Sequence, residues 1–202
     1  HGAHRPIDGG LLISLARLDG VAVDPARQLA AVGGGARWGA VIAAAAPQGL
    51  APISGSSPTV GVVGYLLGGG LGPLARSHGF GSDHVVGFTV VTGAGDLVEA
   101  GADEHPDLFW ALRGGKYGLG VVTELRLRLP EVSSLYAGSL FFAEEHLEAA
   151  LRAWVDWTAT ADQQVSTSVA IIRFPPLDAV PEPLRGRRLL SLRFAYPGPA
   201  AD

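Results

Sequence analysis

The sequence predicts an α+β fold of two domains, and three observations lead to this prediction. The segment VVTELRLRLP alternates apolar and charged residues, which is typical of a half-buried antiparallel strand. A Gly-Ala-Gly turn at residues 93–95 separates two apolar segments and predicts a hairpin. The sequence pattern changes after Pro130, so we place a domain boundary near Glu131 and expect domains at residues 1–130 and 131–202.

The first domain is expected to contain both strands and helices. An apolar run after the turn at residues 8–10 predicts a buried strand, and a helix is expected from Arg37 to Ala46, stopped by Pro47 and Gly49. A second helix follows Asp103 as its cap, with Pro106 at its first position. The expected strands are residues 11–15, 28–32, 87–92, 96–100 and 121–129, and the expected helices are residues 37–46 and 106–113.

The second domain is expected to be a small antiparallel sheet with one helix. Residues 135–142, 165–174 and 188–196 show the pattern of strands, and residues 144–160 show that of an amphipathic helix. A proline-rich connection, PPLDAVPEPLRG, separates the last two strands.

Composition limits the classes of function. The 202 residues are 48% hydrophobic, enough for one large core or two smaller ones, and a net charge of −4 argues against a nucleic-acid partner. The absence of cysteine excludes disulfides, thiolate zinc sites and cysteine nucleophiles. The longest low-charge stretch, residues 61–74, is too short and glycine-rich to span a membrane. The sequence predicts part of a soluble protein, and it leaves the compartment and the oligomeric state open.

The stretch SGSSPTVGVVGYLLGGGLG, residues 54–72, is the candidate binding segment. It lacks the GK[ST] of a P-loop, the last glycine of a Rossmann fingerprint and the second glycine of a nucleophile elbow. Turns in a β-rich domain are one explanation of so much glycine. Another explanation is a binding site for a large cofactor with a pyrophosphate and a ring system. The segment has hydroxyls next to its glycines, and the glycines allow the backbone to come close to such a ligand.

Two motifs carry a specific resemblance to a known family. The run GSSPTVGVVGYLLGGGLGPLARSHGFGSDH, together with HPDLFWALRGGKYGLGVVTELRLRL, is similar to the FAD-binding domain of berberine bridge enzyme-like flavoproteins, in the vanillyl-alcohol oxidase/PCMH superfamily. The resemblance covers residues 1–130 and implies a PCMH-type FAD-binding domain whose N-terminal βαβ portion is absent. A partial substrate domain, an antiparallel sheet with a helix, would follow it. Since the chain contains no methionine and begins abruptly, we expect a piece of a longer protein.

The resemblance assigns cofactor contacts residue by residue. Residues matching the family's isoalloxazine and pyrophosphate segment are Ser57, Pro58, Thr59, Val60 and Gly61. Glycines that let the chain wrap the cofactor match Gly64, Gly68, Gly69 and Gly70, with Tyr65 near the ribityl chain and N1. The adenosine end matches Gly120, Val121 and Val122. Here the chain departs from the family, because Gly118 and Leu119 replace the usual Asn-Phe pair.

Attachment of the flavin is also implied by the resemblance. His1 and Gly2 look like the tail of the family's GGH or TGH loop, so His1 is the candidate for an 8α link, with His4 as the fallback. The alternative is that HGAH is the remnant of a tag. Many relatives have a second, cysteinyl link at the position of Ser57, and serine excludes it here.

The implied activity is that of an FAD-linked oxidoreductase. It would transfer a hydride from an alcohol, sugar or secondary-metabolite substrate to flavin N5 and then reduce dioxygen. Valine at the position of Val60 goes with oxygen access and favours an oxidase. The alternatives are a dehydrogenase that excludes oxygen and a non-catalytic relic of the fold.

The sequence assigns no catalytic base and no metal site. His78, His84 and His105 lack metal-ligand spacing and are interpreted as surface or capping residues. Asp83 is expected to cap a turn, and Arg113 to bind carbonyl groups near the end of its helix. Side chains that could reach the flavin's working face are those of Tyr136, Phe141, Arg173, Phe174 and Tyr196.

Overall fold

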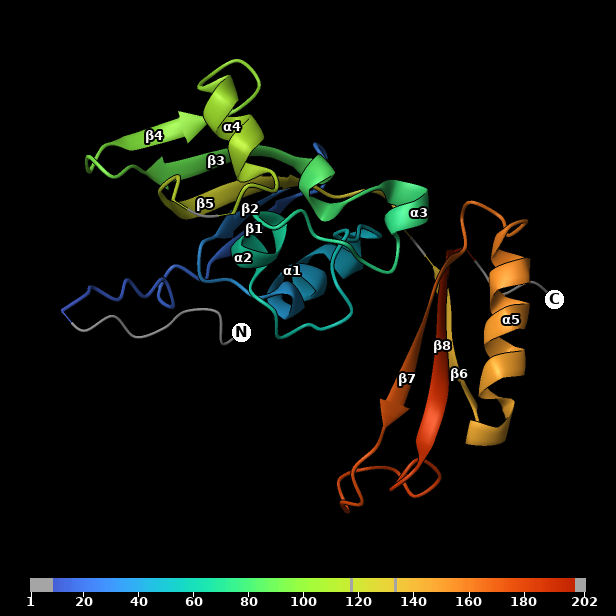
Figure 1. Cartoon of the computed structure of the whole chain (residues 1–202). Helices are drawn as coiled ribbons and strands as arrows, with labels where there is room; N and C mark the ends of the chain where they lie inside the picture. The colour runs from blue at the N-terminus through green and yellow to red at the C-terminus, as the bar shows by residue number, and fades with distance from the viewer. Residues whose placement is uncertain (1–8, 117, 133, 199–202) are drawn as a thin grey trace.

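The computed structural model describes residues 9–116, 118–132 and 134–198 and contains two antiparallel sheets (Figure 1). The strands are β1 (Val21–Asp24), β2 (Leu29–Gly33), β3 (Val85–Val91), β4 (Leu97–Ala100), β5 (Val121–Arg128), β6 (Leu135–Phe142), β7 (Ser166–Arg173) and β8 (Arg188–Pro197). The α-helices are α1 (Trp38–Ala45), α2 (Val62–Leu66), α3 (Ala75–His78), α4 (Pro106–Leu112) and α5 (Leu147–Thr158). Short 3-10 turns are η1 (Ala46–Gln48), η2 (Gly81–His84) and η3 (Glu144–His146).

The first sheet has the strand order β1-β2-β5-β3-β4, with every neighbouring pair antiparallel. Strand β5 is central, and its alternation places Leu125 and Leu127 on the buried face. Arg126 points to the opposite face, where it forms an ion pair of 2.9 Å with Glu99 of β4. The prediction of a half-buried antiparallel strand here is confirmed, and so is the β3–β4 hairpin.

One core joins this sheet to helices α1, α2 and α4. Trp38 and Val41 of α1, Val62 of α2 and Leu112 of α4 are almost fully buried in the same cluster as Leu125. Because an apolar helix stripe and an apolar sheet face must cover each other, this packing fixes where the loops between them emerge. The glycine-rich residues 54–72 form the loop that surrounds the short helix α2 (Figure 1).

The structure corrects three local predictions. Residues 11–15 form no strand, and Leu11 and Leu12 are 88% and 86% exposed. This apolar run does not pair with the sheet but leads into a turn, in which the N–H of Leu18 donates to the carbonyl of Leu15 over 2.8 Å. The edge strand is instead β1, which the sequence did not predict, and the N-cap of α4 is His105 rather than Asp103.

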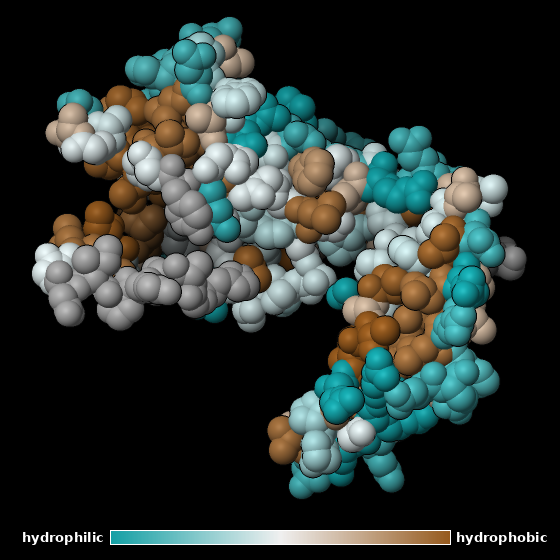
Figure 2. Space-filling view, in the orientation of Figure 1, coloured by the Kyte–Doolittle hydropathy of each residue, from teal (hydrophilic) through white to brown (hydrophobic). Residues whose placement is uncertain are grey.

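The second sheet has the strand order β6-β8-β7 and is antiparallel, as predicted for this part of the chain. Helix α5 packs on one face, where the indole N–H of Trp154 donates to the hydroxyl of Thr167 over 3.2 Å. Apolar side chains in this region remain partly exposed, among them Leu140 and Ile171, each 53% exposed. Figure 2 shows apolar residues gathered in this part of the molecule. The face opposite α5 turns toward the first sheet and its loops.

No helix in the described ranges is long and apolar enough to cross a membrane.

Candidate functional site

The segment before helix α2 is held against the start of helix α1 by its carbonyl groups. The N–H of Gly39 donates to the carbonyl of Pro58 over 2.8 Å, and the N–H of Trp38 donates to that of Val60 over 3.1 Å. Gly61 forms an isolated antiparallel bridge with Arg37 in the same place. These contacts hold the segment through its carbonyl groups and leave Ser56, Thr59 and Gly61 exposed.

Several backbone N–H groups of this segment are hydrogen-bond donors without a protein acceptor. The backbone N–H groups of Ser56, Ser57, Thr59 and Gly61 donate no hydrogen bond to any residue that the structure describes. The hydroxyls of Ser57 and Thr59 lie 3.0 Å apart and bond to each other. A run of unpaired amides next to hydroxyls suits a ligand rich in acceptors, such as a phosphate or a flavin ring edge.

Two glycines of the segment face open space. A Cβ added at Gly64 or at Gly69 would have no heavy atom within 4 Å. Gly69 has a φ of +91°, which accounts for glycine there, but Gly64 lies within helix α2. Glycine in a helix costs about 1 kcal/mol relative to alanine, so its presence where alanine would fit sterically needs another reason. Close approach of a bound cofactor is such a reason.

Tyr65 lies in a cage of glycines. Its ring packs edge-on against Trp38 with centroids 5.6 Å apart. A Cβ at Gly70 would lie 2.6 Å from this ring, and one at Gly55 would lie 3.0 Å from it. The Tyr65 hydroxyl is buried and has no hydrogen-bond partner among the described residues, and burial raises its pKa. A buried hydroxyl of this kind is a donor that a bound acceptor would satisfy.

These observations test whether the segment fits FAD, and they agree with it. Unpaired amides, a helix glycine facing open space and a buried hydroxyl without a partner occur together within Ser56–Tyr65. The ammonium group of Lys116 lies next to Gly68, because a Cβ placed on Gly68 would lie 3.5 Å from its Nζ. Several of the positions expected to contact the cofactor therefore lie in and next to helix α2.

The residues expected to contact the adenosine end, Gly120, Val121 and Val122, have a structural role in the first sheet. Gly120 has a φ of +131°, and an added Cβ would lie 2.7 Å from the carbonyl oxygen of Val91. Val121 and Val122 begin strand β5 and pair with Val91 and Val90. Sheet packing alone accounts for these residues, so their contact with the adenosine end remains a prediction.

The expected covalent tether concerns residues at the N-terminus. His1, Gly2 and His4 lie outside the described residues, so the histidyl link also stays a prediction. The hydroxyl of Ser57 bonds to that of Thr59, and a sequence without cysteine cannot form a cysteinyl link.

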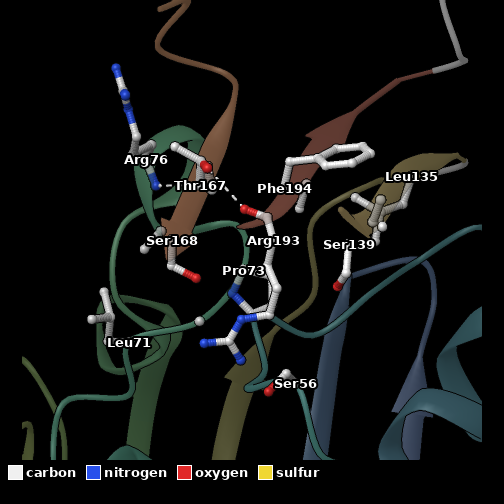
Figure 3. A pocket seen from close by; sticks show the side chains of 16 residues that line it. Ser56, Leu71, Pro73, Arg76, Leu135, Ser139, Thr167, Ser168, Arg193 and Phe194 are labelled. Carbon is white, nitrogen blue, oxygen red and sulfur yellow. Dashed lines mark hydrogen bonds between the residues drawn. The ribbon is translucent and has the colours of Figure 1, made fainter. Parts of the chain in front are cut away.

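A cavity of about 740 Å³ lies between the glycine-rich segment and the second sheet (Figure 3). The segment contributes Ser56 and Gly72, while the strands contribute Ser139, Ser168 and Arg193. Sequence reasoning missed these strand residues. The signal was present in LSLRFAY, where Ser191, Arg193 and Ala195 alternate with larger apolar residues and mark one face of β8.

The side chains that the sequence suggested for the flavin's working face do not line this cavity. They are Tyr136, Phe141, Arg173, Phe174 and Tyr196. Tyr136 instead packs against Phe194, and Phe141 packs against Phe174.

The charged residues after the segment have structural roles. Asp83 accepts a hydrogen bond of 2.9 Å from the N–H of Phe80, which confirms it as a cap. Arg113 donates to the carbonyl of Ser82 over 2.8 Å, a carbonyl of the neighbouring turn. His84 contacts the carbonyl of His78 through Nε2 at 2.8 Å. No group of three or more potential metal ligands occurs in the part of the chain that the structure describes.

Comparisons with known proteins agree with this geometry. Residues 2–101 match the model of a family described as FAD binding domain. (R)-6-hydroxynicotine oxidase of Paenarthrobacter nicotinovorans is 38% identical over 155 residues, which are 74% of this chain and 34% of the relative. An FAD-dependent monooxygenase of Penicillium roqueforti is 33% identical over 165 residues, which are 78% of this chain and 32% of the relative.

A solved structure extends the similarity through both sheets. The crystal structure of glucooligosaccharide oxidase from Acremonium strictum matches with a TM-score of 0.74 and 29% identity, covering 92% of this chain and 36% of that one. The chain spans about a third of the length of the curated relatives it matches.

Proposed function

Because residues 2–101 belong to the FAD binding domain family, and the chain thereby to the vanillyl-alcohol oxidase/PCMH superfamily, we propose that it forms part of an FAD-dependent oxidoreductase. Residues 1–130 would be the FAD-binding domain, and residues 131–202 the beginning of the substrate domain. The observation that carries the proposal is the set of unpaired N–H groups of Ser56, Ser57, Thr59 and Gly61, close in sequence to Gly64, which faces open space.

The residues that would hold FAD divide by what they offer. Ser57, Thr59 and Gly61 offer N–H donors, and Pro58 stiffens the segment between them. Gly64 and Gly69 leave open space for the cofactor, and Gly68 lies beside Lys116. Gly70 leaves room for the ring of Tyr65, which offers a buried hydroxyl. We further propose that Gly120, Val121 and Val122 contact the adenosine end, and that His1, followed by Gly2, carries the flavin through its 8α carbon.

The chain itself would bind, orient and shield the reacting groups. The chemistry that FAD supplies when bound is hydride acceptance at N5 from a substrate carbon and reoxidation by dioxygen to give hydrogen peroxide. The substrate would be a small molecule such as an alcohol, a sugar or a secondary-metabolite intermediate. It would enter the cavity that the glycine-rich segment shares with the second sheet. Apolar wall residues Leu71 and Leu135 would help to exclude water from this space.

Val60 is the residue proposed to decide whether dioxygen reaches the reduced flavin. Its side chain is half-buried against the core, between the anchored segment and helix α2. We propose an oxidase because a compact valine here leaves space for dioxygen. A Val60→Leu variant fills that space with one more methylene and is expected to slow reoxidation.

The experiment is anaerobic reduction of the FAD-loaded protein with dithionite, followed by mixing with oxygenated buffer. Fast return of the 450 nm flavin band with formation of hydrogen peroxide supports an oxidase, and slowing in Val60→Leu supports the role of Val60. Slow reoxidation of the unaltered protein would favour a dehydrogenase. Failure to take up FAD at all would leave only a non-catalytic relic of the fold.

A further inference from the structure

The cavity between the two sheets has an unusual balance of charge. Its lining contains two arginines, Arg76 and Arg193, and no Asp or Glu. The guanidinium of Arg76 is used elsewhere, since its Nη2 donates to the carbonyl of Ala161 over 3.3 Å. Figure 3 shows the Arg193 side chain extending into the cavity toward Ser56 and Pro73. Arg193 is therefore the cation that a molecule in this cavity would meet.

Arg193 also has no carboxylate partner, a property that it shares with some of the described arginines but not with others. Arg113, Arg126, Arg152, Arg185 and Arg188 each form an ion pair with an acidic side chain. Within the described ranges, Arg193 forms none, and its guanidinium donates no hydrogen bond. An arginine fork without a partner, inside a cavity, is available to a ligand.

The strand register places a serine on each side of Arg193. Ser139 of β6 and Ser168 of β7 are the direct cross-strand partners of Arg193 on β8, so all three side chains share one face of the sheet. The next row on that face is Ala137, Ala195 and Ser166, which are small and leave room beside the arginine. Neither Ser139 nor Ser168 uses its hydroxyl in a hydrogen bond with a described residue.

A guanidinium and two neighbouring hydroxyls that bond to no described residue match the acceptors of a carboxylate. The fork can donate two parallel hydrogen bonds to the two carboxylate oxygens, and each serine can donate one more. The remaining wall is apolar through Leu71, Pro73 and Leu135, which suits a hydrocarbon or aromatic body. One cation balances a single negative charge, which favours a carboxylate over a phosphate dianion.

We propose that this cavity selects a substrate carrying a carboxylate, and that Arg193 is the residue that determines this specificity. The inference rests on the proposed function, because the acid would be the molecule that the flavin oxidises. It narrows the substrate class from alcohols and sugars in general to acids with an apolar body. Ser139 and Ser168 orient the carboxylate on the arginine.

The test measures binding without relying on the flavin. The chain is titrated with benzoate, benzamide and inorganic phosphate in an isothermal calorimeter, with and without bound FAD. Benzoate is expected to bind at least about tenfold more tightly than benzamide, because charge-assisted hydrogen bonds exceed neutral ones. Raising the salt concentration is expected to weaken benzoate binding, since Arg193 is exposed.

Three variants locate the effect. Arg193→Gln is expected to lose about tenfold or more in benzoate affinity, while Ser168→Ala loses less. Arg173→Gln removes an exposed arginine of the same sheet outside the cavity and serves as the matched control. Thermal melts of each variant check that the fold is intact.

The outcomes separate the two proposals. Arginine-dependent benzoate binding without FAD uptake would support the cavity assignment and contradict the FAD enzyme. FAD uptake with equal binding of benzoate and benzamide, or with unchanged benzoate affinity in Arg193→Gln, would overturn the inference alone. Tighter binding of phosphate than of benzoate would also overturn it. So would an Arg193→Gln variant that weakens FAD instead of benzoate, because Arg193 would then serve the cofactor.

Discussion

Gly64 offers a substitution whose effects on stability and on cofactor binding should have opposite signs. It lies in the middle of helix α2, and a Cβ there would meet no heavy atom within 4 Å. Gly64→Ala should stabilise the cofactor-free chain by about 1 kcal/mol, because alanine loses less backbone entropy in a helix. For a chain of this size that corresponds to a rise of about 2–4 °C in Tm.

The same methyl group should weaken FAD binding if the cofactor lies against this turn of α2. Overpacking by one methyl costs about 1–3 kcal/mol, so Kd should rise about fivefold or more. Differential scanning calorimetry of the cofactor-free chain and titration of FAD by fluorescence quenching measure the two effects. Gly20→Ala is the matched control, because Gly20 also faces open space but lies outside the segment. Wild-type FAD affinity in Gly64→Ala would refute contact at α2, and a lowered Tm would refute the assignment of open space.

Three further results are expected. Gly72→Ala should destabilise the chain by about 1–3 kcal/mol in calorimetry, because its Cβ would lie 2.2 Å from the carbonyl oxygen of Ser54; an unchanged Tm would contradict this packing. Leu125→Ala should cost about 2–5 kcal/mol in denaturant unfolding, since Leu125 is 1% exposed in the core, and a cost below about 1 kcal/mol would show that the site is not well packed. Burial and, second, the nearby His84 lower the pKa of His78 from its ordinary 6.5, so the unfolded chain binds more protons below that pH. Stability should therefore fall as pH drops below about 6.5, and His78→Gln should flatten this slope in urea titrations from pH 7 to 5; an equal slope in the variant would exclude His78 as its source.

Local patterns predicted the elements whose periodicity is strong. The alternation in VVTELRLRLP fixed both the strand and its buried leucines, because period 2 assigns each side chain to a face without reference to the rest of the fold. Pro106 marked the first residue of α4 for a similar local reason, its preset φ. The hairpin of β3 and β4 followed from its glycine turn.

Pairing decided the elements that were missed. Residues 11–15 are as apolar as a buried strand, but a strand also needs a neighbour for its N–H and carbonyl groups. The less apolar VAVD obtains that neighbour in β2 and becomes β1. Nothing within either segment distinguishes the two cases, because the deciding hydrogen bonds are made elsewhere in the chain.

The candidate site divides in the same way. The glycine-rich segment could be found because its motifs are contiguous in sequence, whereas Arg193 becomes prominent only when β6, β7 and β8 are placed in register. The alternation of LSLRFAY indicates which face of β8 is small and polar. It does not indicate that this face borders a cavity shared with residues 56 and 71–73, more than a hundred positions earlier.

The most direct test of the central claim is a visible absorption spectrum of the protein after incubation with FAD and removal of unbound cofactor, followed by acid precipitation. The account predicts flavin bands near 370 and 450 nm that remain with the protein through gel filtration. Bands that stay in the acid pellet of the unaltered protein, and are lost from that of His1→Ala, would also establish the proposed tether, while their release into the supernatant would remove the covalent link alone. A protein that stays colourless would contradict the claim that residues 56–70 form a site for FAD.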